Sequence, residues 1–419
     1  MNALVFISAL AAQATAPTSS APAPSSAPPA ATTGTEGPTR GQTTYVDLEA
    51  GAGYSTNPVL SFDDNPGSAF GRLSIHGVHS RYSERTNTVL SAFAQNVFYT
   101  NHYGSEQAVD LNARHDTRVS EKLRLFGDLD LAYDRGGQLD TRIIGVPGVP
   151  LVPGTVVPPN LLSPGDFLTV AGKSFRASGH VGGQLALSAR DYLTVTSGIE
   201  HVVSKFSGLD THYTTVPASI GYERQISTRT TIGGRLTAQY TDYDGPTDFR
   251  TITPQLTIQT ALSERMTFSG ALGVSFAAVD NGVDTRHTTG LAANANLCSQ
   301  GERDQFCAHA SINEETATSA GPSRSYVAGV DYSRRLGEDE TVQLSVSAER
   351  YSNPVFFVVG PTFSHATYLR AAADYSRRIH NRLFAGASVS GRKLAQDGPD
   401  PNADVTGSVF IRYRLGDAR

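Results

Sequence analysis

Histidine, serine and aspartate are the side chains in this sequence best suited to acid–base or nucleophilic chemistry. The chain contains 11 histidines at irregular intervals, among them His76, His79, His115, His180, His201 and His212. No G-x-S-x-G segment or other local catalytic signature accompanies them. We therefore predict no catalytic residues and interpret the histidines as lining a polar interior or an interface.

Two cysteines and one acidic turn are the remaining candidates for bond formation or metal binding. Cys298 and Cys307 are the only cysteines, and their spacing in an exported chain predicts one disulfide. The alternative is a two-cysteine metal site with His309, although the spacing matches no standard zinc pattern. The turn Asp63-Asp64-Asn65 is read as solvated rather than as a calcium site, because no ligand series continues it. Gly51-Ala52-Gly53 precedes no helix and is not a nucleotide loop. We expect no cofactor and no metal.

The charged residues form the most informative set, because many of them recur at every second position of apolar segments. A residue pattern of period two places them together on one face of a strand. The two signs nearly balance, which indicates weak ion selectivity or hydrogen bonding to a hydrated solute; the alternative is that the charges only brace the wall. The residues predicted to line a lumen are Asp47, Glu49, Arg72, Asp110, Arg114, Arg124, Asp128, Asp130, Arg176, Glu200, Arg235, Glu349, Arg370, Asp374, Arg392, Arg412 and Arg414.

The elements that must hold these side chains are β-strands. In 266–278, Met266, Phe268, Leu272, Val274 and Phe276 alternate with small or polar residues, which is typical of a half-buried strand. Short polar turns separate successive alternating runs at 83–85, 120–122, 189–191, 227–229, 263–265, 337–339 and 380–382. These seven hairpins, with a first strand at 46–54 and a last at 405–415, predict about sixteen antiparallel strands. Longer loops are expected at 55–69, 135–172, 280–323, 352–365 and 395–403.

Three features favour a membrane barrel over a soluble sandwich, which also alternates apolar and polar residues. The runs are about ten residues long, enough to cross hydrocarbon when tilted. The polar face is charged along whole strands, and the short turns and long loops lie on opposite sides. Aromatic residues gather near strand ends, as in an interfacial girdle: Tyr54, Phe98, Tyr99, Tyr133, Phe206, Tyr222, Tyr240, Tyr332, Tyr351, Tyr375 and Tyr413.

An open sheet edge is not tolerated in lipid, so the first and last strands are expected to pair. Asp47 and Glu49 would then face Arg412 and Arg414 across the closing seam, with direct pairing and independent hydration as the two alternatives. We therefore predict an all-β fold: a transmembrane antiparallel β-barrel with short periplasmic turns and long extracellular loops, in the bacterial outer membrane and in contact with its lipid.

The N-terminal segments are expected to lie outside this barrel. An apolar stretch and the A-x-A site Ala12-Gln13-Ala14 predict a signal peptide over 1–14, although no Lys or Arg precedes the apolar stretch. Residues 15–42 are rich in Ala, Pro, Ser and Thr and predict a disordered periplasmic segment, followed by the barrel over 43–419. The formal net charge of −5 gives no reason to expect a nucleic-acid partner.

Several motifs resemble those of the β-barrel porins often encoded beside exopolysaccharide gene clusters. They are the opening strand 48–58 (LEAGAGYSTNP), the repeated Tyr-Ser-Arg-Arg at 332–335 and 375–378, and the closing segment 410–415 (FIRYRL). The resemblance covers about Thr43 to the end, and the chain departs from the common aromatic C-terminus by ending Gly-Asp-Ala-Arg. It implies an outer-membrane channel that lets a polysaccharide out, with periplasmic polysaccharide-export components as partners.

These observations favour a porin-like channel for small hydrated solutes or an exported polysaccharide, without enzymatic activity. About sixteen strands leave an aqueous channel rather than a packed core. The apolar, Pro-rich loop 143–160 is expected to fold into the mouth, with capping of the outer rim as the alternative. The alternative functions are an outer-membrane hydrolase with residues at the loop rim and a plugged structural or secretion scaffold.

Overall fold

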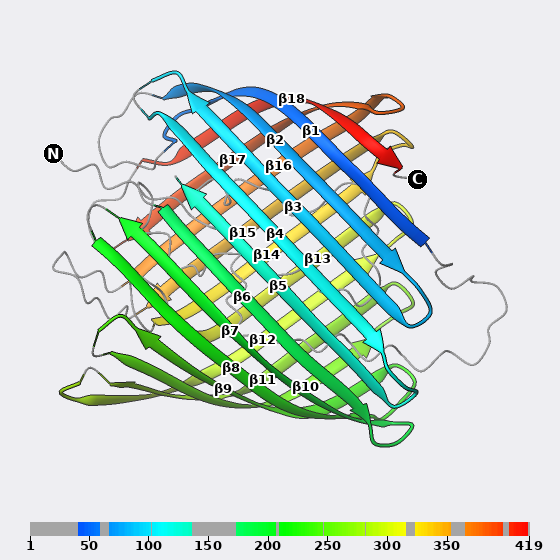
Figure 1. Ribbon diagram of the computed structural model, residues 1–419, viewed down its shortest axis with the longest axis vertical. Coiled ribbons are helices and arrows are strands. Elements are labelled where there is room, and N and C mark those ends of the chain that lie inside the picture. Colours follow the sequence, from blue (N-terminus) through cyan, green and yellow to red (C-terminus); the bar gives the residue numbers. More distant parts are fainter. Residues whose placement is uncertain are drawn as a thin grey trace.

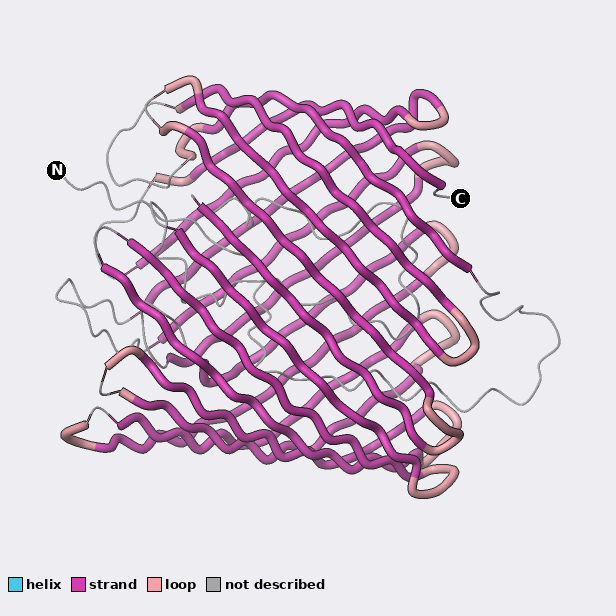
Figure 2. Tube along the Cα trace, in the orientation of Figure 1, coloured by secondary structure: helices cyan, strands magenta, loops and turns pink. Residues whose placement is uncertain are grey.

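The computed structural model describes residues 41–58, 67–101, 103–135, 173–206, 209–245, 247–280, 282–315, 323–352, 365–396 and 402–417. No helix in this part of the chain is long and apolar enough to cross a membrane. The described residues form 18 strands in one sheet (Figures 1 and 2): β1(Gly41–Ser55), β2(Ser68–Tyr82), β3(Thr86–Tyr99), β4(Ser105–Arg118), β5(Leu123–Arg135), β6(Lys173–Ala186), β7(Asp191–Phe206), β8(Leu209–Gln225), β9(Thr230–Tyr243), β10(Asp248–Ala261), β11(Met266–Asp280), β12(Thr285–Gln300), β13(Asp304–Glu315), β14(Ser323–Arg335), β15(Glu340–Ser352), β16(His365–His380), β17(Leu383–Gln396) and β18(Asp404–Asp417).

The sheet closes on itself. Each strand pairs antiparallel with its sequence neighbours, and β1 also pairs with β18. The closing ladder runs from Thr44 opposite Asp417 to Ser55 opposite Thr406. Closure leaves neither terminal strand as an open edge in lipid, so the predicted all-β barrel is confirmed.

The strand number is 18 rather than about sixteen, because the predicted loop 280–323 contains one further hairpin. Strands β12 and β13 lie there, joined by the turn at residues 301–303. Their outward positions include Ala293, Ala295, Ala308 and Ala310, which carry too little apolar surface to reveal a strand by hydrophobic alternation.

Some connections at the long-loop end are short as well, such as the one from Tyr243 to Asp248. The seven predicted turns and the β12–β13 turn all lie at the other end of the barrel, on the right in Figure 2, which we call the short-turn end. In four of them a serine oxygen accepts the backbone N–H three residues later, at 3.0–3.1 Å, as in Ser263 with Met266. In the other three of these turns the accepting serines are Ser83, Ser120 and Ser188. Such local serine bonds satisfy backbone groups in a tight reversal. By the usual polarity of outer-membrane barrels, this end is periplasmic.

Apolar and charged side chains are distributed over the two faces of the sheet in the reverse of the way found in a water-soluble protein. Large apolar side chains point outward and are exposed, such as Leu256 at 74% and Val181 at 68%. Many charged side chains on the inner face are covered, such as Glu349 at 1% exposure. Within the described ranges, buried apolar residues form small groups, for example Phe93 with Ala108 and Ala132. An exterior of this kind is stable only against hydrocarbon.

Most of the aromatic residues expected in girdles do point outward. Tyr54, Phe98, Tyr133 and Tyr240 lie toward the long-loop end of their strands, and Tyr222, Tyr332, Tyr375 and Tyr413 toward the short-turn end. Tyr99 is an exception: it faces inward, where its ring stands 5.8 Å from that of Phe70. The girdle assignment of Tyr99 is therefore wrong, because it lies one residue after the outward Phe98 and so on the opposite face.

Several predicted features fall outside the described residues. They are the signal peptide 1–14, nearly all of segment 15–42, the turn 63–65 and the loop 143–160. The described barrel begins at Gly41, two residues before the predicted boundary.

Candidate functional site: the inner face of the barrel

The inner face is defined by the register of the sheet. Glu49 on β1 faces Arg412 on β18 and Ser74 on β2, and every second residue from these positions points the same way. Following this alternation around the barrel places all seventeen predicted lumen residues on the inner face. The structure brings many of them into contact in three groups.

The first group lies on the closing seam. Glu49 accepts hydrogen bonds from two arginines: Arg72 Nη2 at 2.8 Å from one side, and Arg412 Nε and Nη2 at 3.0 and 2.8 Å from the other. Asp47 accepts two bonds from Arg414, at 2.7 and 2.6 Å. The Arg414 guanidinium also lies 4.3 Å from the centre of the Tyr45 ring. Bidentate charge-assisted bonds are strong and geometrically specific, so these pairs fix the register of β1 against β18.

The second group lies at the opposite end of the seam, and the sequence reasoning missed most of it. Arg392 donates two bonds to Asp404 Oδ2, at 3.0 and 2.6 Å, and both side chains are almost completely buried. Asp404 Oδ1 also accepts from the Ser55 hydroxyl at 2.6 Å and from the backbone N–H of Asn57 at 3.0 Å. Asp404 lies at the first position of its strand, so alternation alone gave no signal for it.

The third group spans β4 to β7. Arg124 donates to Asp116 at 2.7 Å, and Arg176 donates to Glu200 at 3.0 Å. His180 Nδ1 lies 3.0 Å from Asp128 Oδ2. Asp130 accepts from the Asn112 amide at 3.3 Å. Opposite charges on neighbouring strands are therefore matched here as they are at the seam.

Strands β8 to β13 form a different part of the wall, which we call the neutral arc. In these strands the charged or histidine side chains of the described inner face are Glu223, Arg235, Arg286 and His309. Hydroxyls and amides occupy most other inward positions and bond across strands, for example Thr215 to Thr241 at 2.9 Å and Thr253 to Ser275 at 3.2 Å. The Arg235 guanidinium donates to the Gln255 amide oxygen at 3.0 Å. Sequence reasoning missed this asymmetry, although strand composition carries it.

The remaining predicted residues, Asp110, Arg114, Glu349, Arg370 and Asp374, also lie on the inner face. Asp110, Glu349 and Arg370 are buried there. Together with the ion-paired groups they concentrate the charge on the wall formed by β14 to β18 and β1 to β7. The inner surface therefore has a charged half and a mostly uncharged, hydroxyl-rich half.

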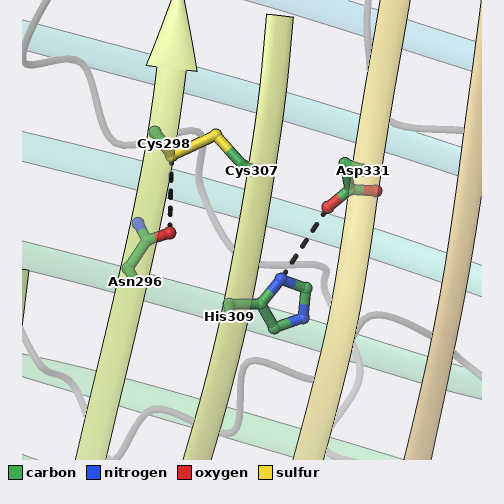
Figure 3. The surroundings of a disulfide bond; sticks show 5 residues. All are labelled: Asn296, Cys298, Cys307, His309 and Asp331. Atoms are coloured by element: carbon green, nitrogen blue, oxygen red, sulfur yellow. Dashed lines mark hydrogen bonds and ion pairs between the residues drawn. A yellow bond between two sulfur atoms is a disulfide. The ribbon is translucent and has the colours of Figure 1, made fainter. Parts of the chain in front are cut away.

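The two cysteines are bonded to each other across β12 and β13 (Figure 3). Cys298 lies directly opposite Cys307, with a Cα–Cα distance of 4.1 Å. Sulfurs joined in a disulfide cannot serve as thiolate ligands, so the two-cysteine metal site is ruled out in this state. His309 Nδ1 instead lies 3.8 Å from Asp331 Oδ2. Among the described residues, no group of three His, Cys, Asp or Glu side chains could hold a metal ion.

A closed barrel with an apolar exterior, two aromatic girdles and a polar inner face defines an integral outer-membrane β-barrel. No protein-family model matches the chain, and no curated protein matches it in sequence.

Solved structures match it at low identity. OccK2 of Pseudomonas aeruginosa in complex with glucuronate has 8% identity and a TM-score of 0.43, covering 90% of this chain and 98% of that one. A BenF-like porin from Pseudomonas fluorescens has 10% identity and a TM-score of 0.43, covering 90% and 99%. The FrpB iron transporter of Neisseria meningitidis has 8% identity and a TM-score of 0.42, covering 89% and 82%. At such identities a similar fold implies no shared substrate.

Proposed function

We propose that the protein is a porin-like channel of the outer membrane, through which small hydrated solutes of low charge diffuse. The observation that carries the proposal is the character of the inner face. Many of its charges are already bound in ion pairs, and one arc offers hydroxyl and amide groups instead. A strongly ion-selective pore would show a ring of one sign at its constriction.

The solute class follows from the same groups. Hydroxyls and amides of the neutral arc exchange hydrogen bonds with polyhydroxylated molecules without the desolvation cost of a charged partner. Sugars are molecules of this kind, and so is an exopolysaccharide in export, which is the finer proposal that the sequence motifs suggest. Export would further require periplasmic partners that deliver the polymer. No catalytic step is part of this function.

Single-channel recording of the purified protein in planar bilayers tests the proposal. Steady ohmic steps with weak selectivity between potassium and chloride are expected. A silent protein that is nevertheless correctly inserted would contradict the channel and favour a plugged scaffold. Cleavage of a lipid or peptide substrate by the same preparation would favour the hydrolase.

Liposome swelling tests the solute class. Uncharged mono- and disaccharides are expected to enter faster than sugar acids of equal size. For export of a polymer, neutral polysaccharide added on the short-turn side should interrupt the current in brief, concentration-dependent blocks. Equal entry of neutral and acidic sugars would contradict the role of the neutral arc.

A further inference from the structure

The lipid-facing side of β11 to β15 contains an apolar groove with a volume of about 730 Å³. Its floor is a row of small residues that stand opposite one another in register on five adjacent strands: Gly270, Ala295, Ala310, Ala328 and Ala348. The neighbouring outward rows contain larger residues. Phe268, Leu297, Val330 and Val346 flank the floor on one side, and Leu272, Ile312 and Tyr326 on the other. Each row is interrupted by one alanine, Ala308 in the first and Ala293 in the second. The groove is therefore a trough between two ridges.

The groove runs obliquely through the membrane. Gly270 lies in the first third of β11, near the short-turn end, and Ala348 lies in the last third of β15, near the long-loop end. Four strand spacings separate these residues, which corresponds to about 19 Å. The trough thus begins near the outer headgroup region and descends deep into the apolar belt, which is the path of an acyl chain.

Two cations mark the outer end of the groove. Arg350 lines the groove and continues the row of Leu272, Ile312 and Tyr326, because it is the register partner of Tyr326. Lys393 lies beyond the end of the groove on the same register row, because Ala348 faces Leu369 on β16 and Leu369 faces Lys393 on β17. Both side chains point outward and are exposed. Neither forms an ion pair with any residue that the structure describes.

Cations on a lipid-facing surface are costly in hydrocarbon and become favourable at the depth of anionic headgroups. Two strand spacings and two residues of rise separate Arg350 from Lys393, so their Cα atoms are about 12 Å apart. That separation suits a headgroup that carries phosphate. A second copy of this chain would have to bury both cations against its own apolar exterior, which is unfavourable.

We propose that the groove binds one acyl chain of a phosphate-bearing lipid of the outer leaflet, with the headgroup held by Arg350 and Lys393. The occupant is an anionic lipid, because Arg350 lines the outer end of the apolar trough and Lys393 lies just beyond that end. This site lies on the outer surface of the barrel and does not depend on whether the lumen conducts.

The sequence contains no tryptophan, so a single introduced tryptophan reports local lipid contact without background. Ile312→Trp places the probe on the ridge beside the groove. Leu73→Trp is the matched control, because residue 73 points outward in the half of β2 that lies toward the long-loop end. The outward residues between it and that end, Tyr54, Ala69 and Phe98, are uncharged. Each variant is reconstituted in phosphatidylcholine vesicles. The probes are phosphatidic acid and phosphatidylcholine with brominated chains, which quench tryptophan on contact.

At Ile312→Trp, brominated phosphatidic acid is expected to bind about 5- to 30-fold more tightly than brominated phosphatidylcholine, since each interfacial cation contributes about a factor of five. Adding R350Q and K393Q should bring this ratio close to one. Leu73→Trp should show a ratio near one in both backgrounds. In a separate variant, Ala328→Leu should fill the trough and weaken quenching by both lipids at Ile312→Trp.

Four results would overturn the proposal. The first is a ratio of phosphatidic acid to phosphatidylcholine binding near one at Ile312→Trp, and the second is a preference for phosphatidic acid at Leu73→Trp as large as that at Ile312→Trp. The third is a preference for phosphatidic acid that survives removal of both cations, and the fourth is a tryptophan at position 312 that an oligomer shields from both lipids. Far-UV circular dichroism of every variant confirms that the strands have formed, and a variant that fails to fold is replaced by Ala310→Leu or by K393Q alone.

Discussion

Replacing Glu49 by glutamine keeps the shape of the side chain and removes the charge that two arginines share. Glu49 lies between Arg72 and Arg412, and the exposed fractions of these side chains are only 12%, 17% and 16%. The substitution leaves two covered guanidinium groups facing a neutral amide. Hydrogen bonds to charged groups contribute about 1.5 to 3 kcal/mol each, and water in the lumen reduces that value. We expect E49Q to lower the free energy of unfolding by about 2 to 4 kcal/mol.

The assay is equilibrium urea unfolding in phospholipid vesicles, followed by far-UV circular dichroism. Asp339→Asn is the matched control, because it removes the carboxylate of the Arg378 ion pair, whose side chains are 44% and 50% exposed. Exposed pairs contribute about 1 kcal/mol or less. A double-mutant cycle with Arg412→Gln then isolates the coupling across the seam. If E49Q and D339N shift the unfolding midpoint equally, the seam pairs do not stabilise closure and the reasoning fails.

Three further predictions follow from other parts of the barrel. Val346→Arg places a cation on the lipid face and should lower the free energy of unfolding in vesicles by about 2 to 4 kcal/mol. Ser345→Arg, on the inner face of the same strand, should lower it much less. Equal losses would contradict the assignment of the two faces. Reduction of the Cys298–Cys307 disulfide, whose partners are 9 residues apart, should lower the free energy of unfolding by about 2 to 3 kcal/mol, measured against a C298S/C307S double variant that dithiothreitol leaves unchanged. Thr253→Lys on the neutral arc should shift the reversal potential in a salt gradient toward anion selectivity. Thr228→Lys, in a short turn, should leave the reversal potential unchanged. No shift with Thr253→Lys would mean that the neutral arc does not border the ion path.

The sequence suffices to predict the closed barrel, because lipid imposes a strict rule on the outward residues. A strand that crosses hydrocarbon must expose apolar side chains at every second position, and this period is visible in β11 without any other information. The charged partners at the seam are equally predictable, since closure requires the first and last strands to meet. Asp47 with Arg414 and Glu49 with Arg412 are paired as expected.

Other features depend on register, which a single sequence does not reveal. The Arg392–Asp404 pair requires knowing that these two residues face each other near the end of the β17–β18 ladder. The contact of Arg72 with Glu49 is diagonal across β1 and β2, because the direct register partner of Arg72 is Gly51. Side chains as long as arginine reach such diagonal neighbours, so alternation identifies the face but not the partner.

The small outward side chains of the hairpin β12–β13 account for its concealment in the sequence, for part of the groove floor and for weak packing between its two strands. Its outward alanines conceal the two strands from hydrophobic alternation, and two of them, Ala295 and Ala310, belong to the floor of the lipid-facing groove. Small outward side chains also add little packing between strands, and the described β12–β13 ladder, from Ala293 opposite Ile312 to Gln300 opposite Gln305, is shorter than the ladders on either side. The disulfide joins these two strands on the inner face, where it constrains the hairpin without filling the groove. We therefore expect loss of the disulfide to loosen β12 against β13 and to weaken lipid quenching at Ile312→Trp while leaving Leu73→Trp unchanged. An unchanged response at Ile312→Trp would show that the ladder alone maintains the shape of the groove.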